Sequence, residues 1–269
     1  MTTSAPIPHP TPTSPRPEGD PASAPGAPSP DSRGRALSKA EDIPKPPAPQ
    51  HPDTERALLL DLDGVLLDTR PVMRQAWRKV QEVHHLDIPF AAYEAHLGRE
   101  FSDIMEQLGV VDVDGAHRTY GAESTSAAHL AQEFIGIREV LHTFVAAGWR
   151  LGVVTSKHVD RAAPLLAQLG CPFGTVRTPA GSGRSKPAPD PLLLALVDLG
   201  VDPAAAVYVG DMEVDREAAT RAGVAYIHAA WGYGDPGSPA AEIAQSATDL
   251  LDLLHDASTP TPIVEGSLA

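Results

Sequence analysis

The chain has 269 residues, a formal net charge of −14 and one cysteine. This length allows one large domain or two smaller ones. The negative charge argues against nucleic acid as a partner, because phosphate backbones require basic patches, and a single cysteine excludes an internal disulfide and a cysteine-rich zinc site.

The first 55 residues hold 15 of the 28 prolines and contain no Phe, Trp or Tyr. Such a segment cannot bury enough apolar surface to offset the entropy of ordering it, so we predict a disordered tail over residues 1–55. Residues 44–49 favour polyproline II, and the docking of a partner on this stretch is the alternative to a plain solvated tail. We see no basic apolar leader and no apolar run of the ~20 residues that span a bilayer, so we expect a cytoplasmic protein without a membrane partner.

The first strand is predicted at residues 58–60, which are apolar and are followed by two carboxylates, Asp61 and Asp63. Gly64 permits a sharp turn, so both carboxylates can converge outside the carboxyl end of a sheet, where open α/β folds bind ligands. Two close carboxylates repel each other unless a proton or a cation lies between them, which indicates a hard metal ion and an Asp free for nucleophilic attack. The alternative for this pair alone is an ordinary acidic turn.

Helical spacing of apolar residues then covers residues 71–135, with no strand signal of similar quality. We predict about four helices there, inserted after the first strand as a cap or lid beside the site. Farther along, short apolar strands are predicted at residues 151–154, 175–177, 206–209 and 224–227. Helices are predicted between them at residues 161–169, 191–199 and 213–222, and this alternation is typical of parallel βαβ units.

Polar residues follow these strands at the same edge of the predicted sheet. Thr155 and Ser156 follow one strand, where hydroxyls serve either as helix caps or as an anion clamp. Lys186 lies in a proline-rich loop, and a single lysine is more often a surface charge. Asp211 follows another strand, and Asp215 lies one helical turn later, which also suits a stable helix terminus. Together the set supplies the parts for phosphoryl transfer through an aspartyl-phosphate.

In order and spacing, these four segments resemble the motifs of the haloacid dehalogenase-like superfamily of hydrolases, over about residues 57–235. The helical insertion is similar to the type 1 cap of that superfamily. Residues 186–190, 206–211 and 231–233 look most like its phosphoglycolate phosphatase-like branch. The resemblance implies a Rossmann-like α/β core over residues 56–70 and 136–258, a helical cap over residues 71–135 and a flexible C-terminal tail over residues 259–269.

The resemblance also implies roles. Asp61 would be the nucleophile, and Asp63 would protonate the leaving oxygen and then activate water. Mg²⁺ would be held by Asp61, the backbone carbonyl of Asp63, and Asp211. Thr155 and Lys186 would bind phosphoryl oxygens, with Ser156 and Gly64 in support, and Asp215 would act as an outer ligand or orient Lys186.

The expected function is hydrolysis of a small phosphate monoester, because Asp63 occupies a position that carbon–halogen-cleaving relatives leave without Asp. A sugar-phosphate mutase or a pyrophosphatase would keep the same motifs, and a non-enzymatic binding module is the alternative from another class. Candidate substrate residues are Arg99, in the loop at residues 96–100, and Lys157 and Arg184 beside the motifs. Cys171, His142 and His158 are expected to be structural.

Overall fold

The structure is a computed structural model that describes residues 55–179, 183–237 and 242–256. The predicted tails over residues 1–55 and 259–269 lie outside the described residues, apart from Glu55. Among the described residues, no helix combines the length and the apolar character that crossing a bilayer requires.

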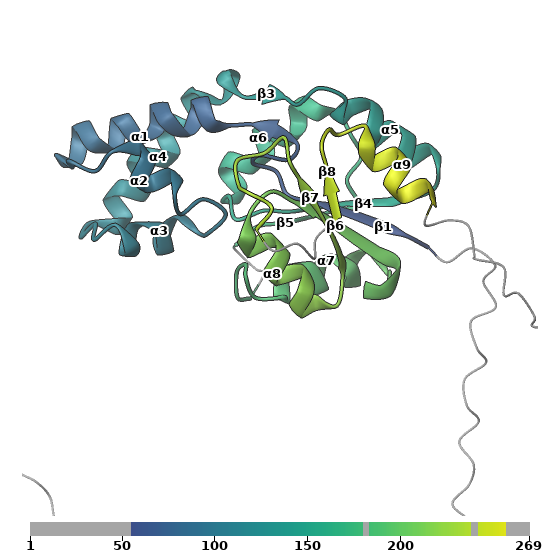
Figure 1. The fold of residues 1–269 in the computed structure, drawn as a ribbon. Helices are drawn as coiled ribbons and strands as arrows, with labels where there is room; N and C mark the ends of the chain where they lie inside the picture. The colour runs from purple at the N-terminus through teal and green to yellow at the C-terminus, as the bar shows by residue number, and fades with distance from the viewer. Residues whose placement is uncertain (1–54, 180–182, 238–241, 257–269) are drawn as a thin grey trace, which may run out of the picture. The chain divides into compact units, whose positions relative to one another are not determined.

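A six-stranded sheet forms the centre of the described structure (Figure 1). Its spatial order is β5-β4-β1-β6-β7-β8, and every neighbouring pair is parallel. The strands are β1 (Ala57–Leu60), β4 (Arg150–Val154), β5 (Thr175–Arg177), β6 (Ala206–Gly210), β7 (Ala225–Ala229) and β8 (Glu242–Ala244). After β1, the chain first adds β4 and β5 on one side of it and then adds β6, β7 and β8 on the other side. The carboxyl end of β1 is therefore a topological switch point, where ligands bind in folds of this kind.

Helices cover both faces of this sheet (Figure 1). One apolar layer joins Leu58 and Leu60 to α5 (Ile137–Ala146), α6 (Val159–Leu169) and α9 (Asp249–Asp256). The other joins Ala57 and Leu59 to α7 (Asp190–Leu199) and α8 (Glu213–Ala222), and a 3₁₀ turn, η2 (Pro203–Ala205), precedes β6. Successive residues of β1 therefore face opposite layers, as side chains alternate along a strand. All four residues of β1 are fully buried, which explains why the strand reads as a continuous apolar run.

The predicted helical insertion is confirmed as four α-helices. These are α1 (Arg70–His84), α2 (Phe90–Glu94), α3 (Phe101–Gln107) and α4 (Val113–Ser126), followed by the 3₁₀ turn η1 (Ala128–Leu130). They enclose an apolar core of their own around Trp77, Tyr93 and Tyr120. A short antiparallel ribbon of β2 (Leu67–Asp68) and β3 (Gln132–Glu133) links the insertion to the sheet-bearing part, and it pairs Asp68 with Gln132.

The predicted strands and helices are present with boundaries that differ by at most two residues, and the structure adds elements that the pattern did not predict. These are the ribbon β2–β3, the edge strand β8, and the helices α5 and α9. The ribbon strands have two residues each and β8 has three, which is too short for a periodic signal. Helix α5 does carry a signal, because Ile137, Val140, Leu141 and Phe144 recur at helical spacing and are buried.

Candidate functional site

Asp61 lies directly beyond the end of β1, at the centre of the sheet. Its backbone N–H donates to the Val209 carbonyl at 2.9 Å, which extends the pairing of β1 with β6 by one residue. The side chain is 4 % exposed. Its Oδ1 accepts a hydrogen bond from the Leu62 N–H at 2.7 Å, and its Oδ2 lies 3.1 Å from the Lys186 ammonium. The carboxylate is thus fixed through both oxygens.

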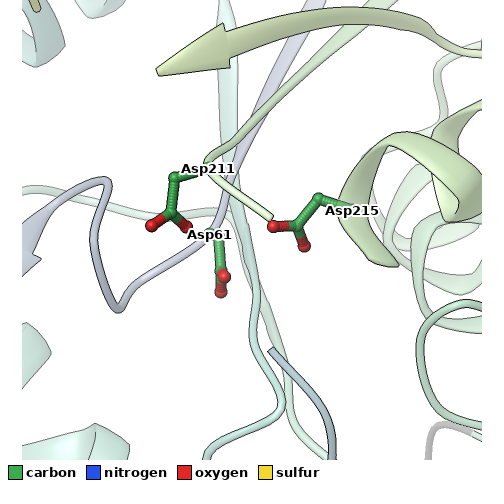
Figure 2. Close-up of side chains that lie close together, drawn as sticks. All are labelled: Asp61, Asp211 and Asp215. Atoms are coloured by element: carbon green, nitrogen blue, oxygen red, sulfur yellow. The ribbon is translucent and has the colours of Figure 1, made fainter. Parts of the chain in front are cut away.

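Asp61, Asp211 and Asp215 form a buried cluster of carboxylates (Figure 2). One oxygen of each lies within 4.8 Å of one oxygen of each of the others. Asp211 Oδ2 accepts a hydrogen bond from the Tyr233 N–H at 2.7 Å, whereas Asp211 Oδ1 is buried without a hydrogen-bond partner. A buried, unpartnered carboxylate oxygen facing two further carboxylates is the donor set that a hard cation such as Mg²⁺ prefers, so the residues fit a divalent metal.

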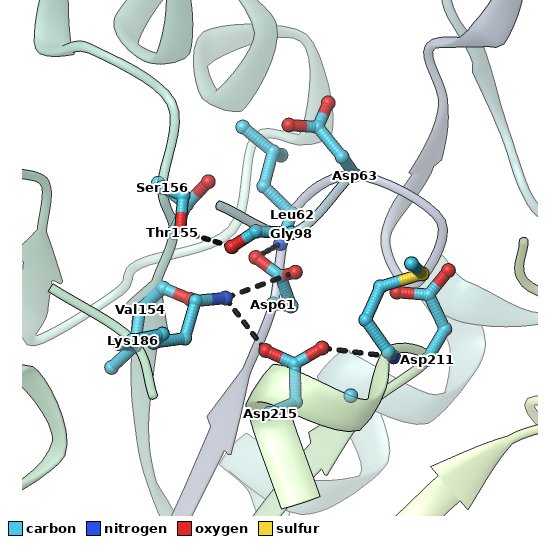
Figure 3. A network of polar contacts seen from close by, with 12 residues as sticks. Asp61, Leu62, Asp63, Gly98, Val154, Thr155, Ser156, Lys186, Asp211 and Asp215 are labelled. Atoms are coloured by element: carbon cyan, nitrogen blue, oxygen red, sulfur yellow. Dashed lines mark hydrogen bonds and ion pairs between the residues drawn. The ribbon is translucent and has the colours of Figure 1, made fainter. Parts of the chain in front are cut away.

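Lys186 is the cation within this cluster, and it is 2 % exposed (Figure 3). Its ammonium lies 2.7 Å from Asp215 Oδ1 and donates to the Tyr208 hydroxyl at 3.1 Å. The Tyr208 hydroxyl also donates to Asp215 Oδ1 at 2.9 Å, and Asp215 Oδ2 accepts from the Met212 N–H at 3.0 Å. Both oxygens of Asp215 are thus engaged, and one of them contacts Lys186, whereas Asp211 has an oxygen without a hydrogen-bond partner.

Burial shapes the protonation of the cluster. It raises the pKa of Asp61 to about 7, with Lys186 acting against this rise and Asp215 and Asp63 adding to it. It also raises the pKa of Asp211 well above its usual range, and the charges of Asp215 and Asp61 add to the rise. Burial acts against the charged form of Lys186, but Asp215 and Asp61 together outweigh it, so the pKa of Lys186 is raised. Three carboxylates thus share one lysine, and without a further cation the raised pKa values favour protonation of Asp61 and Asp211.

Asp63 lies close to this cluster but makes different contacts, and Figure 3 shows its carboxylate directed away from Lys186. Its Oδ1 lies 3.0 Å from the Lys157 ammonium and accepts a hydrogen bond from the Thr69 hydroxyl. Burial lowers the pKa of Lys157, and the charge of Asp63 opposes that change. The two aspartates are thus separated by environment: Asp61 faces Lys186, and Asp63 faces Lys157.

Gly64 forms the turn that follows Asp61 and Asp63, and only glycine fits at this position. Its φ is +81°, in the left-handed region that favours glycine. A Cβ atom at this position would lie 2.1 Å from Asp211 Oδ2, so any side chain would displace this carboxylate. Gly64 therefore permits both the turn after Asp61 and the close approach of Asp211.

The hydroxyls after β4 do not cap the following helix, because α6 begins at Val159 with His158 as its N-cap residue. Thr155 is 5 % exposed, and its hydroxyl accepts a hydrogen bond from the Lys157 N–H at 3.1 Å. The Ser156 hydroxyl donates to the Gly98 carbonyl at 2.6 Å (Figure 3). This bond connects the end of β4 to the loop between α2 and α3.

A cavity lies between the carboxyl edge of the sheet and the helical insertion. Asp61, Asp63, Thr155 and Lys157 line it from the sheet side. From the insertion, Tyr93, Phe101 and Tyr120 form an aromatic wall, and Arg99 and Gly98 border the cavity. The full lining also includes Met73, Leu97, Ile104, Ser156, Arg161, Met212 and Tyr233.

Of the three candidate substrate residues, Lys157 and Arg99 line this cavity and Arg184 does not. The guanidinium of Arg184 is largely exposed and pairs with Asp190 at 3.1 Å. The sequence did not single out three further buried polar residues. Tyr208 lies within a buried strand and contacts Lys186 and Asp215, and Thr69 precedes α1 and contacts Asp63. Arg161 is a buried charge on the apolar side of α6.

Comparisons with known proteins agree with this geometry. Residues 58–229 match the sequence profile of the haloacid dehalogenase-like hydrolase family. The chain is 33% identical over 218 residues to a plasmid phosphoglycolate phosphatase of Cupriavidus necator, covering 76% of this chain and 93% of that protein. It is 31% identical over 219 residues to an N-acetylmuramic acid 6-phosphate phosphatase of Pseudomonas aeruginosa, covering 75% and 96%. A crystal structure of a hydrolase from Pseudomonas syringae shares the fold, with a TM-score of 0.69, 21% identity, and coverage of 75% of this chain and 98% of that one.

Proposed function

Because the chain belongs to the haloacid dehalogenase-like hydrolases, we propose that it is a Mg²⁺-dependent phosphatase that hydrolyses a small phosphate monoester through an aspartyl-phosphate. One observation carries the proposal: a buried carboxylate, Asp61, lies 3.1 Å from a buried ammonium, Lys186, next to an unpartnered oxygen of Asp211. The names of the relatives support the reaction class, since both act on phosphorylated small molecules by name.

Asp61, Asp211 and the backbone carbonyl of Asp63 would hold the metal, with Asp215 behind them. When bound, Mg²⁺ supplies positive charge that offsets the repulsion between a carboxylate nucleophile and a dianionic phosphate. The unpartnered Asp211 Oδ1 and the surplus of carboxylates over Lys186 support this assignment.

In the first half-reaction, an Asp61 oxygen forms a bond to phosphorus, and the bond from phosphorus to the leaving oxygen breaks. Asp63 gives its proton to that oxygen, which leaves as an alcohol. In the second, Asp63 takes a proton from water, the water oxygen bonds to phosphorus, and the carboxylate of Asp61 is released. Lys186 and Thr155 would bind the phosphoryl oxygens throughout, with Ser156 in support.

Residues 71–135 would act as the cap that covers the substrate, and residues 56–70 and 136–258 would form the catalytic core. The hydrogen bond between Ser156 and the Gly98 carbonyl supports this role, because it ties the loop of the insertion to the site. The partner is then a small phosphorylated metabolite, and a cytoplasmic location remains a prediction.

The test measures released phosphate from p-nitrophenyl phosphate and from a panel of phosphorylated metabolites, with Mg²⁺ and with EDTA. We expect turnover only with Mg²⁺, and a loss of at least about 10⁴-fold in kcat for Asp61→Asn. Asp252→Asn, at an exposed position on α9, is the matched control and should retain activity. Full activity of Asp61→Asn or turnover in EDTA would refute the mechanism, and an isomeric sugar phosphate in place of free phosphate would identify a mutase.

A further inference from the structure

Arg161 is a buried cation that the catalytic scheme does not use. It lies in the first turn of α6, is 8 % exposed, and lines the cavity between the sheet edge and the insertion. Within the described residues, its guanidinium has no carboxylate at ion-pair distance. Removing a charge from water without a charged partner is costly, so a buried and unpaired guanidinium calls for an explanation.

The contacts of Arg161 are with aromatic rings from the insertion. Its guanidinium lies 5.1 Å from the ring centroid of Tyr120 and 5.8 Å from that of Phe101. Cation–π contacts of this kind stabilise the charge only in part, and among the residues that the structure describes the guanidinium N–H donors have no hydrogen-bond acceptor. Arg161 therefore presents unused donors at the wall of the cavity.

The position of Arg161 in the cavity matches the side where a leaving group would lie. Lys157 is four residues earlier and contacts Asp63 at 3.0 Å, and Asp63 is the group proposed to protonate the leaving oxygen. The cavity wall therefore runs from Asp63 through Lys157 to Arg161, with two buried cations along it. The carboxylates that line this cavity are Asp61 and Asp63, and both have other partners.

Arg161 also borders a second cavity, which shares Phe101 and Ser156 with the first. A leaving group that reaches Arg161 thus has further space beyond it. The acidic residues on that outer side, Glu100 and Asp114, border the same cavity but lie outside ion-pair distance of Arg161. The guanidinium is consequently available to a ligand from either side.

We propose that Arg161, together with Lys157, forms a subsite for a second anionic group on the leaving group of the substrate. The preferred substrates are then phosphate monoesters whose alcohol carries a carboxylate or another phosphate, and a planar guanidinium suits both because each offers paired oxygens. This inference rests on the proposed phosphatase function and narrows its substrate class.

Three esters built on the same two-carbon unit test the inference: 2-phosphoglycolate, ethylene glycol bisphosphate and ethylene glycol monophosphate. Their far ends carry a carboxylate, a phosphate and a hydroxyl, respectively. With the full chain and Mg²⁺, we expect kcat/KM for at least one anionic ester to exceed that for the hydroxyl ester by about tenfold or more. Whichever anionic ester is preferred identifies the second group.

The variant Arg161→Gln should reduce that preference by about 10- to 100-fold, because the loss falls mainly on the anionic ester. Arg161→Lys keeps the charge without the paired donors and should retain part of the preference; it also serves if the glutamine variant does not fold. Arg118→Gln, the same change at an exposed arginine of α4, should leave the preference as in the wild type.

Equal kcat/KM for the three esters in the wild type would overturn the inference, and so would an equal loss for all three in both Arg161 variants. If the wild type hydrolyses p-nitrophenyl phosphate but prefers no anionic ester, the phosphatase function stands and the subsite is refuted. If no ester releases phosphate, the proposed function itself fails.

Discussion

The Lys186 ammonium lies between two buried carboxylates, 2.7 Å from Asp215 Oδ1 and 3.1 Å from Asp61 Oδ2. Asp215 is in turn held by the Tyr208 hydroxyl and the Met212 N–H. The lysine is therefore positioned beside Asp61, the proposed nucleophile, by the protein itself. Preorganised charge of this kind is the form of stabilisation that phosphoryl transfer requires.

We predict that Asp215→Asn lowers both stability and kcat. The change leaves Lys186 buried with one carboxylate partner, and breaking a buried ion pair costs about 3 kcal/mol or more. Urea unfolding should be measured in excess Mg²⁺, so that relief of repulsion among the remaining carboxylates does not mask the loss. Asp190→Asn, which breaks the exposed pair with Arg184, is the control and should hardly alter the midpoint. An unchanged midpoint for Asp215→Asn would show that Lys186 does not depend on it.

We predict that Thr69→Val lowers kcat by about tenfold, with a smaller change in KM. The Thr69 hydroxyl is buried and donates to Asp63, so its removal frees the carboxylate that must face the leaving oxygen. Steady-state kinetics with p-nitrophenyl phosphate measures the effect. Thr143→Val is the matched control, because its hydroxyl donates to a backbone carbonyl on the exposed side of α5. Equal kcat values for both variants would argue against a positioning role for Thr69.

We predict that Gly98→Ala lowers kcat/KM by about tenfold or more. The φ of Gly98 is +87°, and a Cβ there would lie 2.6 Å from the Val214 side chain, so the loop that bonds to Ser156 would be pushed off the site. Gly109→Ala separates this effect from backbone strain, since Gly109 has a φ of +71° and no atom lies within 4 Å of the position that its added Cβ would take. If the two variants lose activity equally, the contact with Val214 is not what matters.

We predict that Mg²⁺ stabilises the protein more at pH 8 than at pH 5. Burial raises the pKa of Asp61 from 3.8 to about 7, so the metal-free fold favours the protonated form. The stability from this preference is complete below the unfolded pKa and is lost as pH rises through about 7. At 100 times its Kd, Mg²⁺ should raise Tm by about 5–10 °C at pH 8, and less at pH 5, where protons compete for the carboxylates.

Calorimetry at matched ionic strength, with NaCl as the control, measures this difference. In Asp61→Asn, most of the difference between the Mg²⁺-induced rise in Tm at pH 8 and that at pH 5 should disappear, because the variant has one fewer titrating ligand. A Mg²⁺ effect that is the same at both pH values would contradict the prediction.

Much of this fold could be predicted from the sequence, because its central strands are buried on both faces and so read as uninterrupted apolar runs. Residues 57–60 show this best, and the polar residues that end each strand locate the site. The family and the α/β fold predicted from these residues are confirmed. The ribbon of β2 and β3 escaped prediction, since strands of two residues have no period.

The site was predictable where a residue's chemistry is evident from its neighbours along the chain, as for Asp61 and Asp211. The contacts of Tyr208, Thr69 and Arg161 depend on tertiary packing, and local sequence gives no sign of which buried polar atom will meet which partner. Arg184 illustrates the converse: it is close to Lys186 in sequence, yet its side chain is at the surface with Asp190.

The pairing of Asp68 with Gln132 means that the chain leaves the sheet-bearing part and returns to it at two adjacent backbone positions. A segment that replaces the helical insertion needs only to bring its two ends together at this ribbon, whatever its length. The exchange leaves the register of β1 with β4 and β6 unchanged. The helices of the insertion can thus be exchanged without rebuilding the sheet edge that carries Asp61. Transplanting the helices of a relative at this junction would replace the aromatic wall of the cavity and leave Lys157 and Arg161 in place.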